Sequence, residues 1–425
     1  MDTQHYRSFA AIAGAAALAL ALGACSSGSP SGDVELSLVT IDGGDDNKAL
    51  EDIIDAFEEA NPGITVTPTY VPEDTYATKL QTSLIADAPD VASPYGWDTM
   101  FQFSPLDELV FEPNGIDPAD YNATLGNSCS WEGVHYCFGS TVGNMVLFYN
   151  KAMFDAAGVA YPDSRSPMTF DVIAALAAQL TVVGATEEET VFGLVPGLPV
   201  AYLDPAVFLD ESGRGVEATG PDFVGVYESI AQMVADGVAP SEAQVDALGG
   251  GDGDPGLFLS GQAAMVITDN YMLDAAEVAG LEVGLAPTPV PSGYDAWVVS
   301  WTNAMGIPAR AGNKEAAAQF LAFFATEGQE IQANYGLMPL KTSTAVEWAT
   351  TPERQQLQEV ASLARPGVFN PNQWAWNAPL MDAYWAALRG ENVQALLDEA
   401  EPRAQQANDT TWELFDQSLA AVTGQ

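Results

Sequence analysis

Strand patterns and helix patterns alternate along this chain, and this alternation limits the folds that it can adopt. Residues 34–38 (Val-Glu-Leu-Ser-Leu) alternate apolar and polar side chains with period two, which predicts a half-buried strand. Apolar residues at 50, 53, 54 and 57 then share one helical face, and Pro62-Gly63 predicts the end of that helix. A second strand is predicted from residue 64, a buried strand over 145–149, and further helices over 173–180, 227–234 and 317–324. The order predicts an α/β fold.

Length and charge restrict the chain further. Its 425 residues exceed what one hydrophobic core usually serves, so we expect two lobes. With 13 Lys and Arg against 58 Asp and Glu, the net charge is −45, which would repel nucleic acid and anionic membrane surfaces. The acidity fits a solvated surface adapted to raised salt, and the alternative is a cationic ligand.

The N-terminus carries a secretion signal. An apolar run over 9–22 follows Arg7, and as a helix it would rise about 20 Å, too short to span a membrane. Leu22-Gly23-Ala24-Cys25 then resembles the lipobox of bacterial lipoproteins, whose cysteine is acylated and becomes the mature N-terminus. We therefore expect a signal peptide over 1–24, a palmitate-type anchor on Cys25, and a Ser/Gly tether over 25–32. The alternative is an ordinary signal peptide whose cleavage leaves a cysteine.

Cysteine and histidine are scarce in the rest of the chain. Cys129 and Cys137 flank a segment in which Glu132-Gly133 is typical of a hairpin tip, and in an exported chain this pair predicts a local disulfide. After signal cleavage His135 is the remaining histidine, which argues against a metal site and against a hydrolase with a histidine base. The sequence holds no GxSxG, Walker A, HExxH or CxxC motif, so we expect no catalytic residues, no metal and no cofactor.

A series of landmarks in a fixed order covers nearly the whole mature chain. They are 61–66 (Asn-Pro-Gly-Ile-Thr-Val), 88–91 (Ala-Pro-Asp-Val), 106–109 (Leu-Asp-Glu-Leu), 147–151 (Leu-Phe-Tyr-Asn-Lys), 258–265 (Phe-Leu-Ser-Gly-Gln-Ala-Ala-Met), 306–309 (Gly-Ile-Pro-Ala) and 336–339 (Gly-Leu-Met-Pro). Their order and spacing resemble the extracellular solute-binding proteins, family 1, of carbohydrate ABC transporters, which include maltose-binding-protein-like lipoproteins.

The resemblance implies a type II periplasmic-binding-protein fold, in which two hinged α/β lobes hold ligand in the cleft between them. We place lobe I at 33–141 and 287–339 and lobe II at 142–286 and 340–425, with crossovers near 141–144, 286–289 and 339–342. It also implies a non-enzymatic, monomeric, lipid-anchored protein on the extracellular face of the cell membrane. Its partners would be a carbohydrate and the ABC permease subunits, with no nucleic acid.

A sugar site needs flat rings for apolar C–H faces and polar groups for hydroxyls. In the family the loop after the first strand supplies polar groups, here Asp42, Asp45, Asp46 and Asn47, although such a cluster also suits a helix N-terminus. The family places a ring and a carboxylate near Trp97-Asp98. Where similar proteins carry Gly-x-Trp, this chain has Asp269-Asn270-Tyr271. We expect these ligand-binding residues: Asp45, Asp46, Trp97, Asp98, Asn144, Asp269, Tyr271, Trp301, Trp374 and Trp376.

Two of these assignments have alternatives. Trp301 stands where many members have a Gly-rich turn, and it could equally be a core residue. The segment 370–377 is polar and aromatic without periodicity, which favours a binding loop, and at least one of Trp374 and Trp376 is expected to reach the cleft. For the function, the alternatives are a polyamine or other cationic solute on the same scaffold, and an exported glycoside hydrolase.

Overall fold

The protein is described from a computed structural model, which describes residues 33–43, 45–123, 128–186, 188–248, 255–365, 367–372, 374 and 376–423. The chain divides into two units, Met1–Asp33 and Val34–Gln425, and every helix and strand below belongs to the second. The predicted signal peptide, Cys25 and the tether lie outside the described residues. So do the side chains of Asp45, Asp46 and Asp98.

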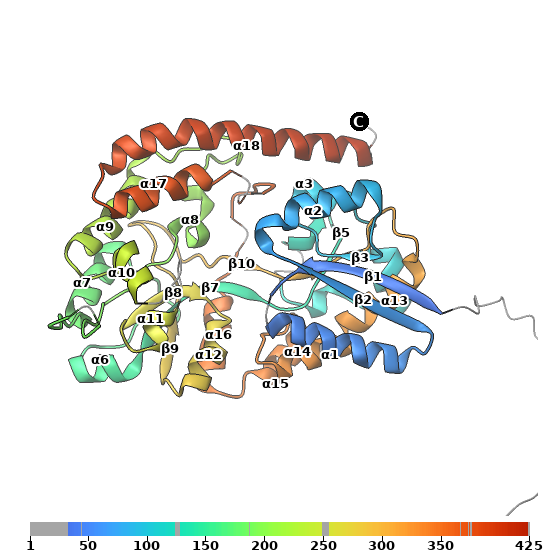
Figure 1. Ribbon diagram of the computed structural model, residues 1–425, viewed down its shortest axis with the longest axis horizontal. Helices are drawn as coiled ribbons and strands as arrows, with labels where there is room; N and C mark the ends of the chain where they lie inside the picture. Colours follow the sequence, from blue (N-terminus) through green and yellow to red (C-terminus); the bar gives the residue numbers. More distant parts are fainter. Residues whose placement is uncertain are drawn as a thin grey trace, which may run out of the picture. The chain divides into compact units, whose positions relative to one another are not determined.

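Short strands and helices alternate as predicted (Figure 1). The strands are β1 (Val34–Ile41), β2 (Ile64–Val71), β3 (Val91–Ala92), β4 (Ser130–Trp131), β5 (Val134–His135), β6 (Phe138–Gly139), β7 (Gly143–Asn150), β8 (Met265–Asp269), β9 (Val283–Ala286), β10 (Ser300–Trp301) and β11 (Ala304–Met305).

The helices fall between and after these strands. They are α1 (Asp45–Ala60), α2 (Glu73–Ala86), α3 (Trp97–Met100), α4 (Glu112–Asn114), α6 (Lys151–Ala157), α7 (Phe170–Leu180), α8 (Pro199–Tyr202), α9 (Pro221–Ala235), α10 (Glu242–Ala247), α11 (Gly256–Leu259), α12 (Met272–Ala279), α13 (Lys314–Ala325), α14 (Glu327–Asn334), α15 (Thr342–Trp348), α16 (Pro352–Ala361), α17 (Ala378–Leu388) and α18 (Val393–Thr423), with single turns η1 (Asp107–Phe111), η2 (Pro118–Asp120) and η3 (Pro205–Val207).

The first sheet is parallel, with strand order β2-β1-β3. The crossover from β1 to β2 and the crossover from β2 to β3 run in opposite directions across the sheet, and because both are right-handed they put α1 and α2 on opposite faces, as Figure 1 shows. The predicted apolar face of α1 is confirmed, because Leu50, Ile53, Ile54 and Phe57 are all buried. Phe57 packs edge-on against Phe320 of α13, with ring centroids 5.2 Å apart. This sheet and its helices belong to one hydrophobic cluster.

The second sheet is built around β7. Its antiparallel partners are β8, β9 and, at its first residues, β10. The buried strand predicted over 145–149 is confirmed as the middle of β7, and the helices predicted over 173–180 and 227–234 are confirmed as parts of α7 and α9. Residues such as Leu147, Ile173 and Tyr227 form a second hydrophobic cluster.

A small hairpin, β4–β5, carries the predicted disulfide. Cys129 and Cys137 are bonded across its open end, which confirms the pairing. Glu132 and Gly133 form its tip with φ of 50° and 83°, the positive values that a two-residue type I′ turn requires. The imidazole Nδ1 of His135 lies 2.9 Å from the Asp107 carboxylate.

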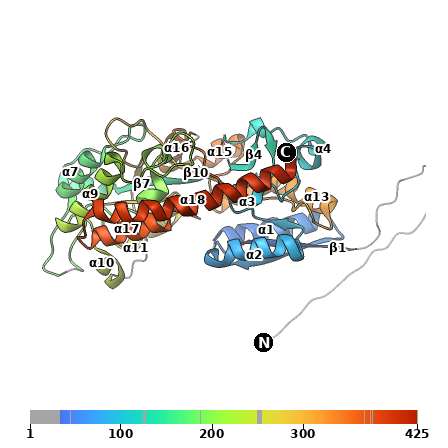
Figure 2. The ribbon, with the colours of Figure 1, turned by 90° about the horizontal axis from the view of Figure 1, so that it is seen from above.

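The long helix α18 is in contact with both halves of the second unit. Leu397, Ala400 and Ala404 pack in the cluster around β7, whereas Trp412 and Phe415 pack in the cluster around the first sheet. Figure 2 shows α18 running from α17 to α3, and residue contacts join it to both. Of the helices that the structure describes, α18 included, none has the apolar length that a bilayer crossing needs.

Candidate functional site

The start of β7 presents one sheet face that collects several predicted site residues. Side chains along a strand alternate between its faces, and directly paired residues on neighbouring strands share a face. Trp301 of β10 pairs with Gly143, and Asp269 of β8 pairs with Met145. These four residues therefore lie on the same face, and the side chains of Trp301, Asp269 and Met145 are all partly exposed there.

The Trp301 indole rests on Gly143. A Cβ built on Gly143 would lie 2.7 Å from the indole Cζ2 and closer still to Cε2 and Nε1, so the ring occupies the space that a side chain would fill. The ring of Tyr271 stands edge-on to this indole, with centroids 6.5 Å apart and planes at 73°. The two rings form an aromatic corner on the β7 face.

Polar groups border this aromatic corner. The amide Nδ2 of Asn303 donates to the Tyr271 hydroxyl at 3.3 Å, and the Thr141 hydroxyl lies at the same distance from it. Asn303 is exposed, whereas Thr141 is fully buried. A ring edge, a hydroxyl and an amide thus lie side by side, which is the mixture that a sugar requires.

Asp269 serves the turn that carries Tyr271. Its Oδ1 accepts the backbone N–H of Tyr271 at 3.0 Å, just before α12 begins at Met272. Burial raises the pKa of the Asp269 carboxyl, and the backbone N–H groups at the start of α12 partly offset this rise. The carboxyl therefore holds the backbone of Tyr271 in place.

Asn144 lies on the opposite face of β7 from Gly143. It is fully buried and donates from Nδ2 to the Val299 carbonyl at 3.2 Å. Its backbone N–H donates to Oδ1 of Asn270 at 2.5 Å, and Asn270 in turn donates to the Val142 carbonyl at 3.1 Å. Asn144 is the next residue after Gly143, so its side chain points to the face of β7 opposite the Trp301 ring. On that side it links β7 to Asn270 and Val299.

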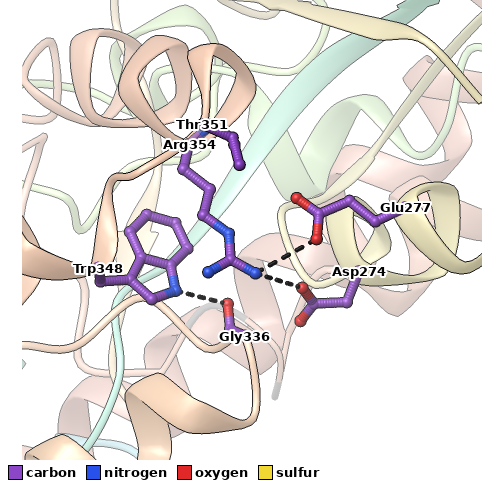
Figure 3. A network of polar contacts seen from close by, with 6 residues as sticks. All are labelled: Asp274, Glu277, Gly336, Trp348, Thr351 and Arg354. Atoms are coloured by element: carbon purple, nitrogen blue, oxygen red, sulfur yellow. Dashed lines mark hydrogen bonds and ion pairs between the residues drawn. The ribbon is translucent and has the colours of Figure 1, made fainter.

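A polar network packs behind α12, the helix that follows Tyr271 (Figure 3). The guanidinium of Arg354 reaches Asp274 at 3.5 Å and Glu277 at 3.3 Å and lies over the Trp348 ring. The Trp348 indole donates to the Gly336 carbonyl at 3.0 Å. Figure 3 shows the guanidinium between the indole and the two carboxylates, so this network ties α12 to α15, α16 and the segment at Gly336.

Trp97 lies at the start of α3, where it is partly buried. Its backbone N–H donates to the Pro371 carbonyl at 2.8 Å. Its indole contacts the rings of Phe101, Trp131 and Phe369, with centroids 6.4, 6.0 and 6.0 Å away. None of the described ring contacts joins Trp97 to the Tyr271–Trp301 corner.

The loop after β1 is closed by Asn47. Asn47 donates to Oδ1 of Asp42 at 2.5 Å and accepts the Gly43 N–H at 3.1 Å. Tyr70 of β2 stands beside this loop, where burial and the nearby Glu51 raise the pKa of its hydroxyl to about 12. Within what is described, this loop has the local geometry of a helix start.

The two tryptophans of segment 370–377 differ in burial. Trp374 is 50% exposed, whereas Trp376 is fully buried among core residues and donates from Nε1 to Oδ1 of Asn370 at 2.9 Å. Trp376 therefore anchors the segment, and Trp374 is the ring that it presents to solvent. Asn303 and Met145 are not among the site residues expected from the sequence, and the strand pairing of Trp301 with Gly143 is what brings both to this face.

The comparisons with known proteins agree with this architecture. The family model for bacterial extracellular solute-binding proteins matches residues 42–331. No curated protein matches the chain. Among solved structures, an ABC substrate-binding protein from Listeria monocytogenes in complex with cycloalternan is 23% identical, with a TM-score of 0.72 over 88% of this chain and 98% of that one.

Two further structures have the same fold. The GacH receptor of Streptomyces glaucescens, determined unliganded and with acarbose, is 20% identical, with a TM-score of 0.70 over 90% of this chain and 99% of that one. The maltose/maltodextrin-binding domain MalE of Bdellovibrio bacteriovorus, bound to maltotriose, is 20% identical, with a TM-score of 0.69 over 88% and 99%. The expected two-lobe periplasmic-binding-protein fold is confirmed. The chain belongs to the bacterial extracellular solute-binding proteins.

Proposed function

We propose that this chain captures a carbohydrate outside the cell membrane and delivers it to the permease of an ABC importer. The observation that carries the proposal is the aromatic corner of Tyr271 and Trp301, bordered by Asn303 and Thr141. Rings give a sugar its apolar contact, and the hydroxyl and amide groups give hydrogen bonds. Solved relatives of this fold hold cycloalternan, maltotriose and acarbose, which supports an oligosaccharide as the ligand class.

Calorimetric titration with maltotriose, mannotriose, cycloalternan and spermidine tests the ligand class. We expect an oligosaccharide to bind, and Tyr271→Ala and Trp301→Ala each to weaken binding by roughly 1–3 kcal/mol through lost apolar contact. Trp385→Ala is the matched control, because Trp385 packs edge-on against Tyr384 within α17, no described ring contact joins it to Tyr271 or Trp301, and the variant should keep the wild-type affinity. Binding of spermidine alone would replace the sugar with a cationic solute.

The ligand is proposed to close two lobes, 33–141 with 287–339 and 142–286 with 340–425, about crossovers near 141–144, 286–289 and 339–342. The second hydrophobic cluster supports this division on one side, because its buried residues come from 147–286 and 376–404, whereas the first cluster takes residues from both proposed lobes, Val146 and Leu285 among them. A ligand that touches both lobes only in the closed state raises the population of that state. Small-angle scattering should then give a smaller radius of gyration at saturating sugar, and an unchanged radius would contradict hinge closure.

The proposal includes a monomeric lipoprotein held by Cys25 on the extracellular face of the membrane. Cys25→Ser should abolish lipid labelling and move the protein from the membrane fraction to the medium. Labelling that survives this substitution would show that the anchor is elsewhere.

The proposal also excludes catalysis. His135, the histidine left after signal cleavage, is engaged with Asp107 beside the disulfide hairpin, and it is not on the β7 face. Incubation with oligosaccharides should release no reducing sugar, and release that depends on active protein would favour a glycoside hydrolase instead.

A further inference from the structure

Trp97 is not held in place by its own helix. The helix α3 is a single turn of four residues, and it follows Gly96, whose φ of 81° and ψ of 161° are accessible mainly to glycine. So short a turn leaves the direction of its first side chain to tertiary contacts. The orientation of the Trp97 indole therefore depends on what packs around it.

Two rings from distant segments pack on the indole and on each other. Trp131 and Phe369 both have centroids 6.0 Å from that of Trp97, and they lie 5.2 Å from each other. Their planes are tilted or edge-on to one another, the geometry that aromatic pairs prefer. Three mutually packed rings leave the Trp97 indole little freedom to rotate.

The hairpin β4–β5 fixes Trp131. Trp131 ends β4 directly before the two-residue tip, and the Cys129–Cys137 disulfide closes the hairpin behind it. Trp131 also contacts Phe415 of α18, with centroids 5.2 Å apart. Loss of the disulfide would therefore loosen the ring that supports Trp97.

Asn370 fixes Phe369. The Asn370 side chain makes four hydrogen bonds: it donates to the Gly213 carbonyl and to Asn408, and it accepts from Trp376 and from the Asn372 N–H. These bonds pin the segment to α18 and to the turn at Gly213. Next to Asn370, the Pro371 carbonyl accepts the Trp97 N–H, so one anchored segment holds both the backbone and the ring of Trp97.

We propose that Trp131 and Phe369 are positioning residues of the ligand site, which hold the Trp97 indole ready to stack on a sugar, and that the Cys129–Cys137 disulfide acts on the ligand affinity through Trp131. The inference rests on the proposed function for the carbohydrate as ligand, and on the expectation from the sequence that the Trp97 indole stacks on it. It adds that Trp131 and Phe369, which do not touch the ligand themselves, affect the affinity of the Trp97 indole for the sugar, and that Trp131 does so from a hairpin closed by the disulfide. A ring that is oriented before binding costs less to order when the ligand arrives.

The first test is a double-mutant cycle on affinity for whichever of maltotriose, mannotriose and cycloalternan the wild type binds. Trp131→Leu, Phe369→Leu and the Cys129→Ala/Cys137→Ala pair should each weaken binding roughly twofold to tenfold. In a Trp97→Ala background the same changes should have no further effect. Phe57→Leu is the control, because it opens the core of the same cluster away from α3 and should lower stability while the affinity stays that of the wild type.

The second test needs no ligand. In protein labelled with fluorotryptophan, the fluorine NMR resonance that disappears in Trp97→Phe belongs to Trp97. That resonance should shift or broaden in Trp131→Leu and in Phe369→Leu and stay unchanged in Phe57→Leu. An unchanged resonance, or affinity losses that are equal with and without Trp97, would overturn the inference. A wild type that binds none of the sugars would instead refute the proposed function, and the resonance would still show whether the two rings hold the indole.

Discussion

Gly143→Ala tests whether the space above Gly143 shapes the aromatic corner. Gly143 does not have a left-handed backbone conformation, so alanine is allowed there and the effect is purely steric. The new Cβ would lie 2.7 Å from Cζ2 of Trp301 and closer to two other indole atoms. Either the indole must then move away from Gly143, or strands β7 and β10 must separate. Overpacking of this kind costs about 1–3 kcal/mol. Loss of the edge-on contact with Tyr271 removes roughly 0.5–1.5 kcal/mol of ring interaction.

The assay combines chemical unfolding with calorimetric titration of the bound sugar. Gly143→Ala should lower both the unfolding free energy and the sugar affinity. In a Trp301→Ala background, where the space is empty, the same substitution should change either quantity by less than about 0.5 kcal/mol. Gly225→Ala is the matched control, since a Cβ there meets nothing within 4 Å and alanine suits the interior of α9. Equal losses with and without the Trp301 ring would refute the steric account.

Three further predictions concern the parts that support the site. Replacing Cys129 and Cys137 together by alanine should lower the unfolding free energy by about 2.5 kcal/mol, measured by denaturant unfolding, because the disulfide closes a short loop. Arg354→Met should cost about 1–3 kcal/mol by leaving Asp274 and Glu277 without their cation, and Arg354→Lys should recover part of this loss, as thermal unfolding can show. Asp269→Asn should gain thermal stability relative to the wild type as the pH rises above 3.8. The fold raises the pKa of the Asp269 carboxyl, so the wild type has the full stability that this group contributes below pH 3.8. It loses that stability as the pH rises and the carboxyl ionises in the folded protein. A stability difference that does not change with pH would show that Asp269 ionises in the fold as readily as in the unfolded chain.

The periodic spacing of apolar residues predicted the helices and strands that bury one face, because the residues on a buried face are apolar and recur at the period of the element. The helix face at Leu50, Ile53, Ile54 and Phe57 and the apolar run in β7 are both of this kind, and both are confirmed. The hairpin tip at Glu132-Gly133 is equally readable, since few residue pairs accept positive φ at two successive positions.

The face of a residue at a strand end could not be read in the same way. Gly143 and Asn144 are neighbours, and which of them shares a face with the Trp301 ring is decided by the pairing with Ser300 and Trp301, far along the chain. Trp374 and Trp376 pose the same difficulty in an irregular segment, where no period exists. The hydrogen bond from Trp376 to Asn370 settles which indole is buried, and only the folded backbone brings that pair together.

The acidity of the whole chain does not select a cation as the ligand of the β7 face. A cation site needs carboxylates that stay ionised and turn toward the ligand. Asp269 is the carboxylate that pairs onto this face within the described side chains, and its Oδ1 is taken by the Tyr271 N–H. The rings, amide and hydroxyls beside it suit a neutral, hydroxyl-rich ligand. The net charge of −45 therefore acts on the solvent and on solubility rather than on the choice of ligand at this face.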